Sequence, residues 1–175
     1  MTKHLFALAA GAATVAAAPA PALDEGRDEA AVNRIYEIVA AGVAAGSGEG
    51  IVDAFAEEAV VMDSRPTPPA AGEAFRKTLV AMAARLKADG VRMSAQYRIE
   101  RRVRSGELTI DTGYRRQTMI PPGAAAEPRV QYHKFLVVAQ RQRDGSWKIL
   151  RDASLPASKE AWDGAVRAPG LKFDG

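Results

Sequence analysis

The chain has 175 residues, of which 47% are hydrophobic and 26% charged, a balance typical of one folded domain rather than a disordered segment. It has no cysteine and only two histidines, His4 and His133, which excludes disulfides and thiolate sites and nearly excludes a histidine-based metal centre within one chain. The formal net charge of +3 is lower than nucleic-acid-binding domains usually carry. We therefore expect no metal or other cofactor and no nucleic-acid partner.

The first 22 residues have the pattern of a secretory signal peptide. Lys3 precedes an apolar run over residues 5–18, which is too short to span a bilayer as a helix. Ala20, Pro21 and Ala22 fit the small-x-small rule for cleavage before Leu23. The alternative is an ordinary alanine-rich helix. Cleavage predicts a secreted or periplasmic protein with no stable membrane insertion.

Helical patterns and one short strand follow. Residues 23–29 are a polar lead-in, in which Asp28 is a suitable N-cap for a helix that ends at the glycines of residues 46–50. A short helix is expected over 49–56, a strand over 60–63 and, after a proline-rich loop, a third helix over 71–88. The apolar stripes of the two long helices are Val32, Ile35, Tyr36, Val39 and Val43, and then Phe75, Leu79, Met82 and Leu86.

From Val91 the hydrophobic period changes to two, which indicates strands. We expect strands over 91–100, 108–114, 130–143 and 146–154, with turns at Ser105-Gly106 and Asp144-Gly145 and a bulge at Gly113. Helices followed by long antiparallel strands predict an α+β fold, in which a curved sheet wraps three helices and encloses a pocket. The domain is expected over residues 30–156, and in the tail over 157–175 Trp162 and Phe173 are the residues able to dock on it.

Three stretches carry a resemblance: VNRIY at 32–36, GIVDAFAEEAVVMD at 50–63 and GSWKILRD at 145–152. They resemble the nuclear-transport-factor-two-like superfamily of cystatin-like α+β cones, and in particular its SnoaL-like and ketosteroid-isomerase-like branch. The middle stretch is very like the ketosteroid isomerase segment, and the last is typical of small secreted members of unassigned function. The resemblance implies the cone fold and a homodimer formed through the outer sheet face. It does not choose a function, because the superfamily contains enzymes, binding modules and transport factors.

The resemblance also implies two catalytic candidates. Asp63 matches the general base at the end of the first strand of ketosteroid isomerase, and Tyr36 matches the tyrosine of the first helix that donates to the enolate oxygen. That family has a second donor, an aspartic acid kept protonated on the third strand. This chain has no clear counterpart, and the nearest region is Tyr132–Lys134.

The chemistry of each candidate residue is consistent with two different roles. Asp63 follows an apolar strand, where lost hydration raises the pKa of a carboxyl, but it is also suited to turn the chain and pair with Arg65. Tyr36 is either a donor aimed into the pocket or a core aromatic residue. His133 is either a proton shuttle near neutral pH or a structural histidine.

The last strand allows two registers. In one, Asp152 faces the pocket together with Leu150, and in the other Trp147 faces it and brings Arg151 inside. Phe55 is a further candidate for the pocket wall. The strand arginines at 98, 101, 102, 104, 115, 116, 141 and 143 form a basic stripe, most of which is expected on the solvated face or edge of the sheet.

These observations favour an exported pocket protein that binds a small apolar molecule without catalysis, or serves as an interaction domain. The alternative is a cofactor-independent isomerase or lyase, in which Asp63 removes a proton next to a carbonyl and Tyr36 stabilises the enolate. The alternative requires Asp63 and Tyr36 to converge on one shared cavity.

Overall fold

The computed structural model describes residues 25–64, 67–123, 127–169 and 171–173. The predicted signal peptide, residues 1–22, lies outside this part of the chain. No helix within the described residues is long and apolar enough to cross a membrane.

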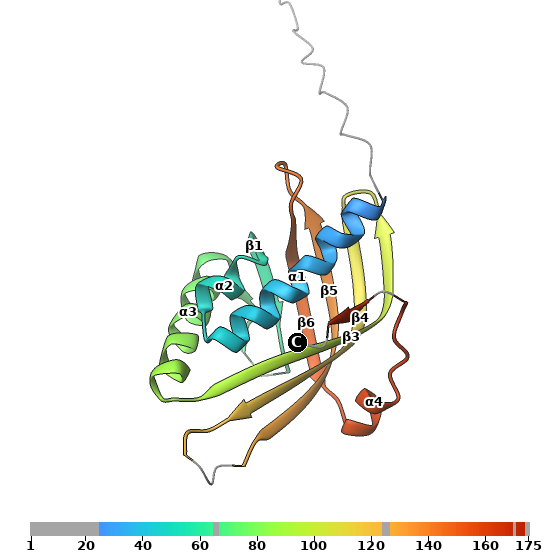
Figure 1. The fold of residues 1–175 in the computed structure, drawn as a ribbon. Coiled ribbons are helices and arrows are strands. Elements are labelled where there is room, and N and C mark those ends of the chain that lie inside the picture. The colour runs from blue at the N-terminus through green and yellow to red at the C-terminus, as the bar shows by residue number, and fades with distance from the viewer. Residues whose placement is uncertain (1–24, 65–66, 124–126, 170, 174–175) are drawn as a thin grey trace, which may run out of the picture.

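Helices lead the described chain and strands dominate its second half (Figure 1). The α+β class predicted from the sequence is therefore confirmed. The elements in order are α1 (Glu25–Ala45), α2 (Gly48–Val52), β1 (Phe55–Met62), β2 (Ala70–Ala71), α3 (Gly72–Ala88), β3 (Arg92–Ser105), β4 (Leu108–Ile120), β5 (Arg129–Arg141), β6 (Trp147–Pro156), α4 (Lys159–Asp163) and β7 (Lys172–Phe173).

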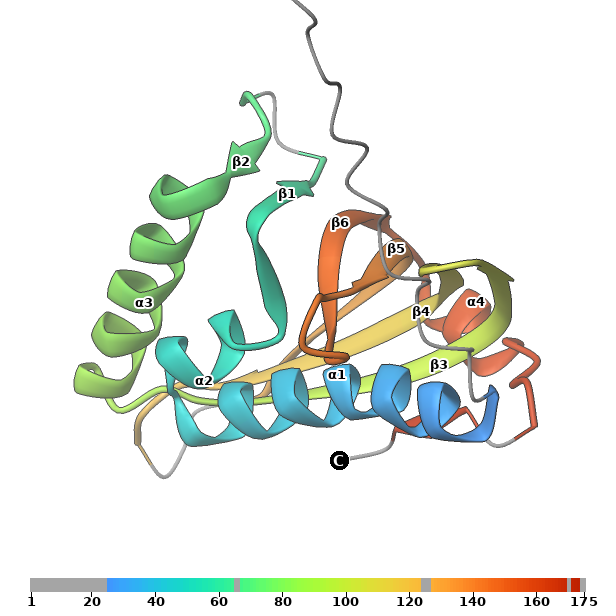
Figure 2. The ribbon, with the colours of Figure 1, turned by 90° about the horizontal axis from the view of Figure 1, so that it is seen from above.

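The seven strands of the described residues form one curved sheet in the order β2-β1-β6-β5-β4-β3-β7. Every pairing is antiparallel except that of β1 with β6. Figure 2 shows α1 lying across the strands and α3 standing to one side. Helix α1 contacts β3 and β6, whereas α3 packs against α2, β1 and β2. This division of contacts leaves the interior between α3 and the central strands without helix packing.

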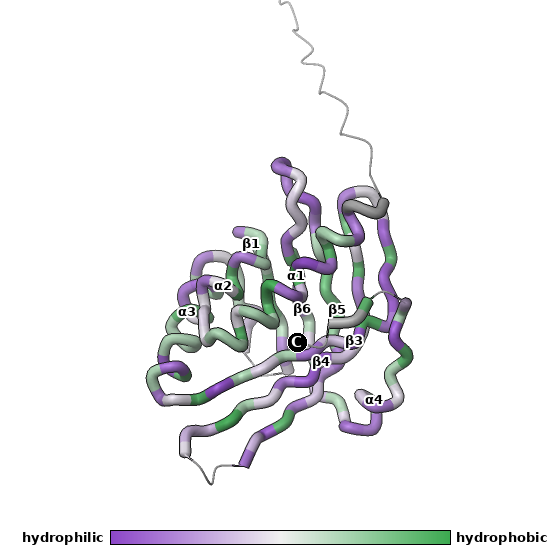
Figure 3. Tube along the Cα trace, viewed as in Figure 1, coloured by the Kyte–Doolittle hydropathy of each residue, from purple (hydrophilic) through white to green (hydrophobic). Residues whose placement is uncertain are grey.

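The core lies where α1 meets the inner face of the sheet. Ile35 and Tyr36 are almost fully buried, and the ring of Tyr36 packs edge-to-face on Tyr97 with 5.1 Å between centroids. Phe135 of β5 contacts both rings. Hydrophobic and hydrophilic residues alternate along the strands in Figure 3, as period-two patterning requires. The apolar stripe predicted for the first helix is therefore the stripe that faces the sheet.

Helix α1 begins before its predicted N-cap. It starts at Glu25, so Asp28 lies inside the first turns and is 2% exposed. The Nε1 of Trp147 donates to Asp28 at 3.1 Å, and Arg104 lies 3.3 Å from its other oxygen. Asp28 therefore holds the helix to the sheet instead of capping it.

A bulge in β3 changes which residues face inward. The pairing with β4 shifts between Ile99 and Arg101, opposite Gly113. The bulge predicted at Gly113 therefore lies in the partner strand. A Cβ at residue 113 would lie 2.1 Å from the backbone oxygen of Arg98, so only glycine allows this approach. Beyond the bulge, Arg102 turns into the interior with only 5% of its side chain exposed.

Arg102 is the centre of a buried cluster of polar side chains. Its Nε and Nη2 donate to the two oxygens of Asp111 at 2.8 and 2.7 Å, and its Nη1 donates to Glu29 and Asn33 of α1. The hydroxyl of Tyr36 donates to Asp111 at 2.7 Å. The prediction of a solvated basic stripe is thus wrong for Arg102, because bidentate pairing satisfies its charge inside the protein.

The C-terminal segment docks on the outer face of the sheet. Trp162 of α4 is 4% exposed, and the guanidinium of Arg98 lies 4.2 Å from the centroid of its ring. Strand β7 then pairs with β3, the free edge of the sheet. The segment therefore covers part of the outer face and protects one edge.

Replacing Asp111 with alanine is expected to destabilise the fold by about 3–5 kcal/mol, because Arg102 keeps its buried charge without its main partner. Urea unfolding followed by circular dichroism measures this. The control is Lys77→Ala, which breaks an ion pair of 2.8 Å whose side chains are 75% and 78% exposed, with an expected loss below about 1 kcal/mol. Equal losses in both variants would show that the cluster does not hold α1 in place.

Candidate functional site

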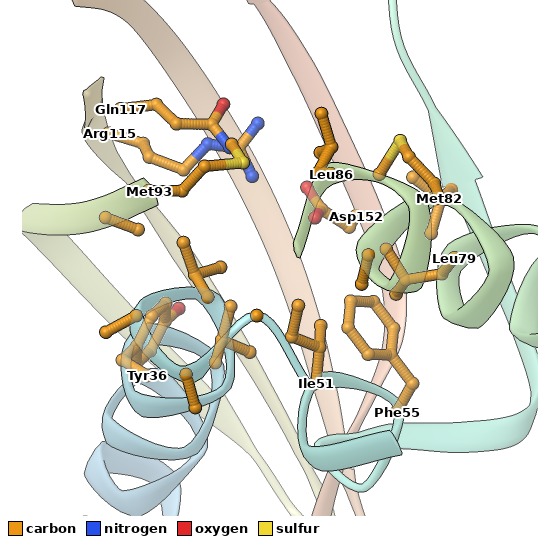
Figure 4. A pocket seen from close by; sticks show the side chains of 18 of the residues that line it. Tyr36, Ile51, Phe55, Leu79, Met82, Leu86, Met93, Arg115, Gln117 and Asp152 are labelled. Carbon is orange, nitrogen blue, oxygen red and sulfur yellow. The ribbon is translucent and has the colours of Figure 1, made fainter. Parts of the chain in front are cut away.

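A cavity of about 430 Å³ lies between α1, α3 and the inner face of the sheet (Figure 4). This size lies within the range of small-molecule sites. Its walls are mainly apolar and include Val39, Val43, Ile51, Phe55, Val61, Phe75, Leu79, Leu86, Phe135, Val137 and Ile149.

The cavity lies between α3 and the central strands, because α3 packs against α2, β1 and β2 instead of those strands. Gly48 of α2 approaches α3 so closely that a Cβ there would lie 2.4 Å from the Cα of Val80. This contact leaves the apolar stripe of α3 facing open space. Of the stripe predicted to be buried, Phe75 is buried, Leu79 and Leu86 are half-buried, and Met82 is 51% exposed. These side chains line the cavity rather than fill it.

A bulge in β6 brings Asp152 into the cavity. The pairing with β5 shifts between Arg151, opposite Val138, and Ile149, opposite Ala139, so Leu150 is the extra residue. Trp147 and Ile149 face inward before the bulge, and Asp152 faces inward after it. Neither of the two predicted registers therefore holds along the whole strand. Arg151 does not line the cavity, and its Nη1 donates to the carbonyl of Leu150 at 2.7 Å.

Arg115 of β4 lines the same cavity as Asp152. Its Nη2 lies 3.5 Å from the Oγ of Ser154, and within the described residues it forms no salt bridge with Asp152 at 4.0 Å or less. Tyr97 and Gln117 also contribute polar groups to this part of the wall, and Lys87 and Arg92 line the cavity at the end of α3. Figure 4 shows Arg115 and Gln117 on one side of the space and the α3 side chains Leu79, Met82 and Leu86 on another.

Burial sets the electrostatics of this polar part. Asp152 is 9% exposed, and its Oδ1 is buried without a hydrogen-bond partner in the described structure. Loss of hydration raises the pKa of Asp152, and the positive charge of Arg115 offsets only part of that rise. Burial lowers the pKa of Arg115, but Tyr97 and Asp152 more than compensate, so Arg115 remains a cation.

Tyr36 lines the cavity with its ring, but its hydroxyl proton is committed elsewhere. The hydroxyl donates to Asp111 at 2.7 Å, and burial, followed by the charge of Asp111, raises the pKa of the phenol well above its ordinary value. A single phenolic proton serves one strong acceptor at a time. Tyr36 is thus placed as a structural donor to Asp111.

Asp63 lies outside the cavity. Strand β1 ends at Met62, one residue earlier than predicted, and Asp63 is exposed beyond it. Asp63 lines a neighbouring pocket of about 420 Å³, which shares Phe75, Leu79 and other wall residues with the cavity. The structure therefore does not bring Asp63 and Tyr36 to one shared cavity.

The two other candidates differ in their positions. Phe55 begins β1 instead of ending the second helix, lines the cavity and packs against Phe75 with 5.1 Å between ring centroids. His133 is half-buried on the inner side of β5 but does not line the cavity. Burial, and then the charge of Arg115, lower the pKa of His133, which favours its neutral form at neutral pH.

Sequence reasoning missed Arg115, Gln117 and Tyr97. The sequence places Arg115 in the basic stripe, most of which is expected on the solvated face or edge of the sheet. In the structure Thr109 and Asp111 are buried while Ile110 is 38% exposed. The available signal was the row of polar residues at 109, 111, 115 and 117, which share one face of β4.

No protein-family model and no curated protein matches this chain. Solved structures match its fold. A ketosteroid isomerase-like protein from Erwinia carotovora atroseptica is 15% identical, with a TM-score of 0.59, over 78% of this chain and 99% of the other. ActVI-ORFA from Streptomyces coelicolor is 15% identical, with a TM-score of 0.59, over 73% and 96% of the two chains.

An NTF2-like protein with a cystatin-like fold from Novosphingobium aromaticivorans is 13% identical, with a TM-score of 0.57, over 77% of this chain and 86% of the other. Identities this low show the fold alone. The chain therefore has the NTF2-like, cystatin-like cone fold and ketosteroid-isomerase-like structural neighbours, as the sequence resemblance implied.

Asp152→Asn is expected to change how stability depends on pH. Because the folded protein holds the Asp152 proton to a higher pH than the unfolded chain, stability falls as pH rises from the unfolded pKa of about 4 through the raised folded pKa. The variant escapes this loss, which is at most about 1.4 kcal/mol per pH unit. Urea unfolding at several pH values is expected to show a gain near neutral pH that vanishes below about pH 4. A gain independent of pH would contradict ionisation of a desolvated Asp152.

Proposed function

We propose that this protein binds a mainly apolar small molecule in the cavity between α1, α3 and the sheet. The observation that supports this most strongly is the space of about 430 Å³, whose apolar walls are not packed against one another. A protein core is normally filled to high density, so a space of this size reduces stability unless an occupant compensates. Burial of an apolar ligand there gains about 25 cal/mol for each Å² removed from water.

The wall formed by α3 is the proposed entrance. Met82 is 51% exposed although it lines the cavity, and Leu79 and Leu86 are only half-buried. Lys87 and Arg92 lie on either side of the turn from α3 to β3. Both are exposed, and both also line the cavity. Small displacements of this helix face would admit a ligand without disturbing the packing of α1 on the sheet.

Binding agrees better with the geometry than the catalytic alternative does. An enolisation that uses Asp63 and Tyr36 needs both groups on one substrate, and these residues line different pockets. The Tyr36 proton is also held by the carboxylate of Asp111. A protein that only holds its ligand needs neither residue as a reacting group.

Export and pairing are proposals on separate grounds. The pattern of residues 1–22 supports export. The outer sheet face exposes Leu136 by 41% and Leu155 by 50%, which supports a homodimer through the part of this face that α4 leaves open.

The binding proposal is tested with N-phenyl-1-naphthylamine, a neutral probe that fluoresces in apolar surroundings. We expect saturable binding of one probe per chain, weakened by about tenfold or more in Met93→Trp, because the larger ring occupies the cavity. The control is Val103→Trp, at a position that is 42% exposed and does not line the cavity. Failure to bind, or equal affinity in the two folded variants, would overturn the proposal.

A further inference from the structure

The described residues that line the cavity include one carboxylate, Asp152, and three cations: Arg115, and the exposed Lys87 and Arg92 at one end. Asp152 and Arg115 both line it, and no carboxylate oxygen of Asp152 lies within 4.0 Å of an Arg115 nitrogen. Asp152 is 9% exposed, and its Oδ1 has no hydrogen-bond partner within the part of the chain that the structure describes. The Nε of Arg115 is likewise buried without an acceptor.

A buried polar group without a partner loses the full free energy of its hydration, so such groups are rare in folded proteins. Here an acceptor and a donor are both left unsatisfied on the wall of one cavity. The Oγ of Ser154 lies 3.5 Å from the Nη2 of Arg115 and gives it at most a weak hydrogen bond. Tyr97 also interacts with the Arg115 side chain, but neither residue satisfies its Nε. The site is therefore incomplete in its hydrogen bonding at the place where a ligand would be enclosed.

We infer that the ligand carries a hydroxyl group, which sits between Asp152 and Arg115, donates to the carboxylate and accepts from the guanidinium. This inference rests on the proposed binding function and names the class of ligand: a neutral, mainly apolar alcohol or phenol. The rest of the molecule lies against the apolar walls formed by Phe55, Phe75 and Leu79.

A hydroxyl suits this pair better than the other common groups. It is a donor and an acceptor in one atom, so it satisfies both charged side chains at once. In the position between the two side chains, a ligand carboxylate would lie beside the carboxylate of Asp152 and a ligand ammonium beside the guanidinium of Arg115, so each would meet a like charge. A ketone or ether accepts from Arg115 but leaves the carboxylate without a donor, and a hydrocarbon satisfies neither.

Four probes of nearly equal shape separate these possibilities: 2-naphthol, 2-methoxynaphthalene, 2-acetylnaphthalene and 2-methylnaphthalene. Their dissociation constants are measured near neutral pH by displacement of N-phenyl-1-naphthylamine from the full chain. We expect 2-naphthol to bind more tightly than 2-methylnaphthalene by about tenfold or more, with the ether and the ketone in between. In Asp152→Asn the advantage of 2-naphthol is expected to shrink several-fold, while 2-methylnaphthalene binds as before. Asp63→Asn, the same change on the exposed carboxylate outside the cavity, is expected to leave all four unchanged.

The outcomes distinguish failure of the proposed binding function from failure of the proposed hydroxyl subsite. If none of the four probes displaces the dye, the binding function itself fails. If all four bind with equal affinity, the apolar cavity binds ligands but the hydroxyl subsite is refuted. If 2-acetylnaphthalene binds most tightly, the subsite takes a carbonyl oxygen, with Asp152 as a protonated donor, and the inference of a hydroxyl is overturned.

Discussion

The buried ion pair of Arg102 and Asp111 fixes helix α1 on the sheet, and the remaining architecture follows from that position. Arg102 donates to both oxygens of Asp111 and also reaches Glu29 and Asn33 on the helix. Removing charged groups from water is costly, and it is tolerated here because each donor and acceptor meets a partner of opposite character. The cluster lies under the N-terminal half of α1, so the C-terminal half is free to form a wall of the cavity.

The same cluster changes the chemistry that the site can perform. Tyr36 lies on the helix face that lines the cavity, but its proton is held by Asp111. The polar character of the cavity instead comes from Asp152 and Arg115, which enter from two strands and remain apart. A mainly apolar cavity, in which Asp152 and Arg115 lie apart on the inner wall while Lys87 and Arg92 are exposed at one end, is suited to orient a ligand by one polar group. The bulge in β6 makes this possible, because it places Asp152 inside without removing Trp147 and Ile149 from the core.

The sequence predicted the features that depend on local pattern. The stripe of α1, the change to period two after Val91, and the turns at Gly106 and Gly145, both with positive φ, were all read from neighbouring residues. The fold class followed from the order of these elements, and the resemblance to cone proteins rested on the stretches 32–36, 50–63 and 145–152. Phe55 was expected in the pocket wall and lines the cavity, although it does so from a strand rather than a helix.

The predictions that were wrong concern residues whose positions depend on contacts between distant parts of the chain. The inner face of β4 carries Asp111 and Arg115, whose hydrogen-bond partners belong to α1, β3 and β6. Arg102 and Asp111 are opposite each other in the β3–β4 hairpin, so the predicted turn pairs them, but only the packing of α1 shows that this pair lies on the inner face. No glycine or proline marks the bulge at Leu150 in the sequence. Strict alternation therefore places either Asp152 or Arg151 in the cavity, whereas in the structure the alternation shifts at the bulge.

The most direct test of the central claim is a crystal structure of the protein with 6-bromo-2-naphthol, located by the anomalous scattering of bromine. The account predicts one bromine peak among the apolar residues of the cavity, with the naphthol oxygen within hydrogen-bonding distance of both Asp152 and Arg115. A peak on the outer face of the sheet or in the pocket beside Asp63, with an unoccupied cavity, would contradict it.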